Sequence, residues 1–252
     1  MKRSTRTKQS KTTYKVLSAL AMFLTWWVLS VLVGKSYIIP SPPLVLSAMN
    51  EIIKTQVFYV SLFSTMIRTF ICMCLSMIIG IILGILAGYF ESVKAFLAPF
   101  MRAIKTLPTI VVIVYAIIWL PGNLAPIMVT ALITLPIVYA NVLEGIENIS
   151  TELDEVFVVY DISERKRMRF LIWPSLLPYV KAALVNITSL GLKVMIASEV
   201  LSQTQPSIGK SFQLAKINLQ TEVVFAWAIV TICLALGLEY LLKRIIFGQK
   251  IF

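Results

Sequence analysis

The sequence contains no histidine and few charged residues, and these two deficits narrow the class of protein. Asp, Glu, Lys and Arg make up only 14% of its 252 residues, whereas 58% are hydrophobic. A soluble domain of this size would need far more charge on its surface. Only three cysteines are present, all within apolar stretches, so we expect neither a disulfide framework nor a metal site.

A further absence concerns catalysis. The sequence has no G-x-x-x-x-G-K-[ST] phosphate loop, so we expect that this chain binds no cofactor and cannot hydrolyse ATP by itself. A membrane-embedded enzyme would need clustered catalytic side chains. The lack of histidine and the few acids in the apolar stretches argue against such an enzyme.

What the sequence has in abundance is apolar stretches, several of them about 20 residues long, the length with which a helix crosses the ~30 Å hydrocarbon layer. The short alternating segments of a β-barrel are absent. We therefore predict an all-α integral membrane protein. Its expected transmembrane helices, about six, are Val16–Val33, Ser64–Tyr89, Pro108–Leu120, Leu124–Leu143, Ala182–Leu201 and Val223–Leu242. The third begins at Pro108, a residue suited to a first helical turn.

Basic residues are distributed unevenly between the connections, and this bias sets the predicted orientation. With the N-terminus inside, the inner segments hold 17 of the 23 Lys and Arg residues. The predicted parts are a basic cytoplasmic N-terminus (1–15), a transmembrane domain (16–245) with a cytoplasmic loop at 144–181, and a cytoplasmic tail (246–252). Because this bias explains the net charge of +11, we expect no nucleic-acid partner.

Two kinds of residue stand out inside the predicted spans. Gly80, Gly84 and Gly88 recur at a four-residue spacing that lets another helix backbone approach closely. Lys193 and Glu199 are charged residues of the fifth span, and such residues usually face an interior. Lys193 either lines a path that favours an anionic substrate group, or forms a structural pair with Glu199 of another subunit or with another helix. Glu199 is alternatively an outer-gate residue.

The longest charged segment, TELDEVFVVYDISERKRMRFLIWP, separates the fourth and fifth spans. Thr151 and Asp154 resemble an N-cap and its capping-box partner, and apolar residues then recur at helical spacing. Ser163 is suited to cap a second helix, which Pro174 would end. The segment therefore predicts a helix, an exposed turn at 160–163 and a second helix on the cytoplasmic surface.

The charge order of this segment has two interpretations. Seven of the twelve acidic residues lie between Glu144 and Glu164, and a basic cluster follows. A membrane-surface helix whose basic side chains meet anionic lipid would explain the basic cluster. The acidic-then-basic order instead suits a protein partner with its own charge pattern.

The stretch EVFVVYDISERKRMRFLIWPSLLP resembles the cytoplasmic signature loop of bacterial ABC-transporter permeases, written as E-A-A, three residues, G, nine residues, I-x-L-P. Glu155 matches the opening acid, and Ile172-Trp173-Pro174 corresponds to the closing residues. Asp161 stands where glycine is usual. Since Asp tolerates turn conformations better than most residues, the resemblance implies a modified coupling turn.

Further segments resemble the nitrate, sulfonate and taurine branch of these importers. They are Pro40-Ser41-Pro42, the second-span sequences STMIR and GIILGILAGY, the connecting sequences LAPF and KTLP, and SLGLK, EVL and SIG in and after the fifth span. Together these segments cover roughly residues 37–245.

The resemblance implies a type I importer fold and a permease subunit that forms the translocation path in a bacterial inner or plasma membrane. The implied partners are an ATP-binding cassette ATPase subunit that uses the ATP, an extracytoplasmic substrate-binding protein, a second permease copy in a homodimer, and the lipid bilayer. The implied substrate is a small organic compound or ion, with or without an anionic charge, of the sulfonate, nitrate, taurine or thiamine-precursor type. The expected ATPase contacts are Glu155, Tyr160, Asp161, Ile162, Ser163, Arg165 and Arg167.

Two alternatives remain on the sequence alone. Arg165 and Arg167 either contact the rim of the ATPase or meet lipid phosphate. The chain as a whole would alternatively be a secondary transporter or channel, which would show inverted repeats and helices broken at the midplane around ionisable residues. The sequence contains no convincing repeat.

Overall fold

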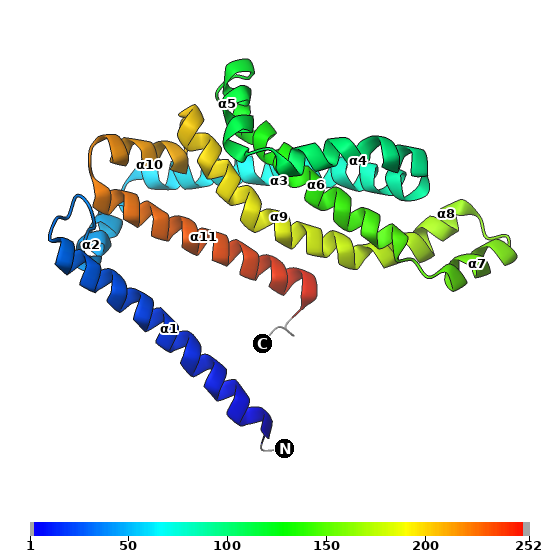
Figure 1. Cartoon of the computed structure of the whole chain (residues 1–252), viewed down its shortest axis with the longest axis horizontal. Coiled ribbons are helices and arrows are strands. Elements are labelled where there is room, and N and C mark those ends of the chain that lie inside the picture. The colour runs from blue at the N-terminus through cyan, green and yellow to red at the C-terminus, as the bar shows by residue number, and fades with distance from the viewer. Residues whose placement is uncertain (1–2, 249–252) are drawn as a thin grey trace. The chain divides into compact units, whose positions relative to one another are not determined.

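The structure is a computed structural model that describes residues 3–248, and this part of the chain consists of helices and connections without a β-strand (Figure 1). The helices are α1 (Arg3–Val33), α2 (Pro42–Ile53), α3 (Gln56–Tyr89), α4 (Glu91–Thr106), α5 (Thr109–Trp119), α6 (Ala125–Glu147), α7 (Thr151–Val159), α8 (Glu164–Arg167), a π-helical turn (Met168–Ile172), α9 (Trp173–Ser202), α10 (Ile208–Ile217) and α11 (Thr221–Phe247). The all-α prediction is confirmed.

The prediction of about six spans is also confirmed. Within residues 3–248, five helical segments are long and apolar enough to cross a membrane, and they lie in α1, α3, α6, the continuous helix Glu164–Ser202 and α11. Helices α4 and α5 meet this criterion only together and are bent by 99° at the break between them. Counting the bent pair as one span gives six.

Several helix boundaries differ from the predictions. Helix α1 begins at Arg3 and is therefore longer than the predicted apolar stretch from Val16. Pro108 precedes α5 as its N-cap residue, with φ −59° and ψ 125°, so it does not occupy the first helical position. Helix α11 continues to Phe247. The last four residues of the predicted tail, 249–252, and residues 1–2 of the predicted N-terminal segment lie outside the described residues.

The described chain forms two compact units, 3–58 with 211–230 and 59–210 with 231–248. An aromatic contact organises the first. Trp26 of α1 stacks on Phe225 of α11 with ring centroids 5.8 Å apart, and its indole N–H donates to the Pro40 carbonyl oxygen at 3.1 Å. Val45 and Ala48 of α2 are buried in the same cluster, so the short helix after the first span packs on the beginning of the last one.

In the second unit, α3 and α6 approach so closely that no side chain fits on α3 along one stripe. A Cβ atom at Gly84 would lie 2.7 Å from the Cβ of Val142 and 3.1 Å from the carbonyl oxygen of Tyr139. The facing pairs along the stripe are Gly80 with Val138, Gly84 with Val142 and Gly88 with Ile146. The packing depends on the absence of side chains at these three positions.

Helix α6 in turn packs along α9, and the core of the second unit lies between them and α3. Val138, Val142, Leu176 and Met195 are fully buried in this core. A hydrogen bond of 2.6 Å joins the hydroxyl groups of Ser76 on α3 and Thr134 on α6. Helix α9 carries Lys193 and Glu199, the charged residues of the predicted fifth span, so this packing determines where the two residues lie.

The glycine stripe gives a stability prediction with a matched control. We expect Gly84→Ala to lower the free energy of unfolding by about 1–3 kcal/mol, because the added methyl group overpacks the α3–α6 contact. Gly237→Ala adds the same methyl group to α11 at a position with no neighbouring atom within 4 Å, and should not destabilise the protein. Thermal unfolding of the purified protein in detergent measures both. Equal effects of the two substitutions would show that the contact does not limit stability.

Candidate functional site

The charged segment forms a helix, a turn and a second helix, as predicted, but its first cap differs. Ser150 is the capping residue of α7, since its hydroxyl accepts the Leu153 N–H at 3.3 Å and its carbonyl oxygen accepts the Asp154 N–H at 3.1 Å. Thr151, the predicted cap, is the first residue of the helix. A serine directly before an equally suitable threonine shifts the start by one residue.

Helix α7 ends in a tight turn that places Asp161 in the left-handed conformation. Asp161 has φ +47°, and the Ile162 N–H donates to the Phe157 carbonyl oxygen at 3.0 Å. A bond spanning five residues around one left-handed residue is the Schellman ending of a helix. This position usually takes glycine, and Asp is among the few other residues that tolerate it. The turn expected from the signature loop is therefore present with Asp in place of glycine.

An ion-pair network joins the two arms of this helical hairpin. Arg167 of α8 donates through Nε and Nη2 to both carboxylate oxygens of Asp154 on α7, each at 2.7 Å. It also lies 3.3 Å from Glu164 on its own helix. The bidentate geometry is the strongest form of an arginine–carboxylate contact. The pair therefore holds α7 and α8 together on either side of the turn.

The network separates the predicted ATPase contacts into two groups. The side chains of Glu155, Tyr160, Asp161, Ser163 and Arg165 are exposed, and that of Ile162 is half-buried. Arg167 is held inside the hairpin instead, so its prediction as a rim or lipid contact is corrected: its donors already face Asp154 and Glu164. Asp154 and Arg167 are thirteen residues apart in the sequence, so no local pattern predicted that they would pair.

The second arm continues into the fifth span, contrary to the prediction that Pro174 ends it. Ser163 precedes α8 but makes no side-chain capping bond. A π-helical turn at Met168–Ile172 follows, in which the Trp173 N–H donates to the Met168 carbonyl oxygen five residues back. Pro174 then occupies the first turn of α9, where its missing N–H is tolerated. The hairpin and the span are thus one helical rod from Glu164 to Ser202.

Glu199, a predicted residue of the substrate path, is enclosed in a structural network. Its carboxylate accepts hydrogen bonds from Arg68 at 2.9 Å, from the Thr65 hydroxyl at 2.9 Å and from the Gly209 N–H at 3.4 Å. The residue has no exposed surface. The arginine partner in this network was not predicted. The sequence signal that could have predicted this pair is that Arg68 and Glu199 are opposite charges within predicted spans. The roles of Glu199 in the substrate path and as an outer-gate residue stay predictions.

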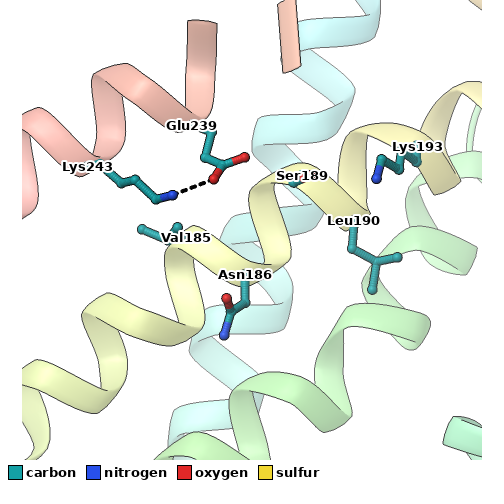
Figure 2. Close-up of a pocket in the computed structure, with 7 residues that line it drawn as sticks. All are labelled: Val185, Asn186, Ser189, Leu190, Lys193, Glu239 and Lys243. Atoms are coloured by element: carbon teal, nitrogen blue, oxygen red, sulfur yellow. Dashed lines mark hydrogen bonds and ion pairs between the residues drawn. The ribbon is translucent and has the colours of Figure 1, made fainter. Parts of the chain in front are cut away.

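Lys193 lies apart from Glu199, in a pocket between α9 and α11 (Figure 2). The pocket has a volume of about 390 Å³. Its lining residues are Val185, Asn186, Ser189, Leu190, Lys193, Glu239 and Lys243. Lys193 is exposed, and none of the ion pairs in the described part of the chain includes it. An intrachain pair between Lys193 and Glu199 is therefore not formed.

The structure thus combines helices long and apolar enough to cross a membrane, an ion-paired hairpin and a charged pocket between α9 and α11. Residues 76–247 match the family described as binding-protein-dependent transport system inner membrane component, so the chain belongs to this family. It is a multi-pass membrane protein and the permease subunit of an ABC importer, a class that works with ATPase and substrate-binding partners. A search of curated proteins finds no match.

A solved structure shows the same fold. The chain is similar to the crystal structure of an amino acid ABC transporter with histidines, at 16% identity and a TM-score of 0.62. The match covers 77% of this chain and 94% of that one. The type I permease fold is thereby confirmed, whereas the nitrate, sulfonate and taurine branch stays a prediction.

The arginine network gives a prediction for the hairpin. We expect Arg167→Gln to speed amide hydrogen exchange in residues 151–163 about fivefold, because it breaks a bidentate contact whose coupling is on the order of 1 kcal/mol. Asp154→Asn should have the same effect, and the double variant should add little. Arg165→Gln is the control, because Arg165 is exposed and outside the ion pairs of the described residues. Equal exchange in all variants would contradict the role of the pair.

Proposed function

We propose that the turn at residues 160–163 is the surface through which this permease couples to its ATPase. The observation that carries the proposal is an exposed turn held in one conformation. Tyr160 is 74% exposed at the tip, Asp161 adopts a left-handed conformation, and Arg167 ties the two arms together. A rigid projection loses little conformational entropy on docking and can transmit a displacement.

The continuous helix that follows supports a coupling role. Residues 164–202 form one helical segment that begins in the hairpin and contains Lys193. Movement at the turn would be passed along this rod to the pocket. Glu155 and Arg165 are exposed on the two arms and are proposed to contact the ATPase beside the turn.

We further propose that Lys193 lines the substrate path and favours an anionic group. A lysine in the middle of a predicted span is costly against lipid, so it is expected to face water, a ligand or a partner charge. Its ammonium group lies in a pocket with polar neighbours, including Asn186 and Ser189. Small organic compounds or ions of the nitrate, sulfonate, taurine or thiamine-precursor type remain the proposed substrates, and those with an anionic group would meet Lys193.

The assembly around this chain is proposed from the resemblance and the family. It consists of two permease copies in a homodimer, an ATPase subunit at each coupling turn and an extracytoplasmic binding protein that delivers the substrate. Both termini are proposed to be cytoplasmic, as the distribution of basic residues predicts. Family membership favours this assembly over a secondary transporter or channel.

Asp161 provides a direct test of the coupling turn. We expect Asp161→Arg to abolish co-purification with the ATPase and reduce transport at least about tenfold, because it puts a bulky cation at the tip of the docking surface. Asp161→Gly is the control, since glycine adopts the left-handed conformation easily and should preserve assembly. Co-purification from cells that express the whole transporter measures the first effect and uptake measures the second. Intact assembly and transport in Asp161→Arg would remove this turn from the interface.

Lys193 provides a separate test of the path. We expect Lys193→Met, which keeps the length of the side chain and removes its charge, to reduce ATP-driven uptake of an anionic substrate about tenfold or more without affecting ATPase assembly. Lys193→Arg should retain part of the activity. Unchanged uptake by Lys193→Met would eliminate the proposed role of the ammonium group.

A further inference from the structure

The pocket between α9 and α11 contains two charged residues that the sequence analysis did not single out. Glu239 and Lys243 lie one turn apart on α11, and the Lys243 ammonium donates to Glu239 Oε1. Figure 2 shows this pair toward the left, Lys193 on the right, and Ser189 between Glu239 and Lys193. The charged groups that line the pocket are therefore two ammonium groups and one carboxylate.

These charges do not cancel. The Glu239–Lys243 pair is neutral as a unit, and Lys193 belongs to none of the ion pairs among residues 3–248. All three residues lie in segments long and apolar enough to cross a membrane. An uncompensated charge is costly in such an environment, because the low dielectric weakens its solvation. The pocket therefore has one surplus positive charge, and a ligand with one negative charge would neutralise it.

Neutral polar groups complete the lining. The Asn186 amide and the Ser189 hydroxyl lie on α9 at helical spacing with Lys193 and can hydrogen-bond to an anion without adding charge. Val185 and Leu190 supply apolar surface beside them. The volume of about 390 Å³ falls in the range of sites for small organic molecules.

We propose that this pocket selects compounds with a single negative charge, such as small sulfonates and carboxylates, and that Glu239 is the residue that rejects dianions. The proposal rests on the substrate path at Lys193 and deepens it. A monoanion at Lys193 brings the pocket to neutrality. A dianion leaves one negative charge in excess in a pocket that the Glu239 carboxylate also lines, and like charges repel.

The test compares two small ligands of nearly equal shape that differ in charge. Methanesulfonate carries one negative charge, and methylphosphonate carries two at alkaline pH. Saturation-transfer NMR on the methyl protons reports the binding of each to the purified full-length permease in lipid nanodiscs. The wild-type chain should prefer methanesulfonate at least about tenfold, because the second negative charge of methylphosphonate is repelled by the Glu239 carboxylate. Equal binding of the two ligands to wild type would overturn the proposal.

Three variants alter the charge count in defined ways. Glu239→Gln raises the surplus to two positive charges and should shift the preference about tenfold toward methylphosphonate. Lys193→Met removes the surplus, so both ligands should lose binding. Lys210→Met removes a lysine that hydrogen-bonds Gln203 outside the pocket and should leave the preference unchanged.

The outcomes separate this inference from the proposed path. If Lys193→Met loses methanesulfonate but Glu239→Gln keeps the wild-type preference, Glu239 is not the selecting residue and the path at Lys193 stands. If Lys193→Met binds methanesulfonate as wild type does, both fail. Neither result bears on the coupling turn, which Asp161→Arg tests by itself.

Discussion

The close approach of α3 and α6 is the constraint on which the second unit depends. Three glycines on one face of α3 let the backbone of this helix reach Val138, Val142 and Ile146 of α6. Lipid tails are as apolar as the side chains they would replace, so helices in a membrane are held by close packing and hydrogen bonds. The Ser76–Thr134 hydrogen bond supplies one such contact beside the stripe. Because α9 packs along α6, its position depends on the contact between α3 and α6.

The charged residues Glu199 and Lys193 of the fifth span lie in two different environments. The Glu199 carboxylate is surrounded by donors from Thr65, Arg68 and Gly209, which satisfy it completely within the fold. Removing Arg68 would leave the buried Glu199 carboxylate without its ion-pair partner. Lys193 instead faces a pocket. The first charge is compensated within the fold, whereas Lys193 belongs to none of the ion pairs among residues 3–248.

The sequence predicts most of the fold because apolar length and glycine spacing are local signals. The spans, the exposed turn and the position of the glycine stripe could all be read from neighbouring residues. Helices α2, α4 and α10 were not predicted, since they are short or too polar to register as spans. The prediction that Pro174 ends the second helix is wrong, because a π-helical turn precedes Pro174 and the helix continues through it. No residue pattern predicts that turn.

The site was less predictable, because its contacts join distant segments. Asp154 and Arg167 meet only after the chain reverses at Asp161, and Arg68 meets Glu199 only when two spans pack. Glu239 gave no signal at all, since an acid four residues before Lys243 also fits an ordinary pair on a helix surface. Glu239 lines one pocket with Lys193 only because α9 and α11 lie side by side in the fold.

The uninterrupted helix from Glu164 to Ser202 has a mechanical consequence. Its 39 residues extend about 58 Å at 1.5 Å per residue, nearly twice the thickness of the hydrocarbon layer. The hairpin lies at one end of this rod, and Lys193 lies toward the other end. The π-helical turn at Met168–Ile172 lies close to the hairpin end. If the hairpin is the coupling surface that we propose, a displacement there would reach the membrane-spanning part of the same helix through this turn.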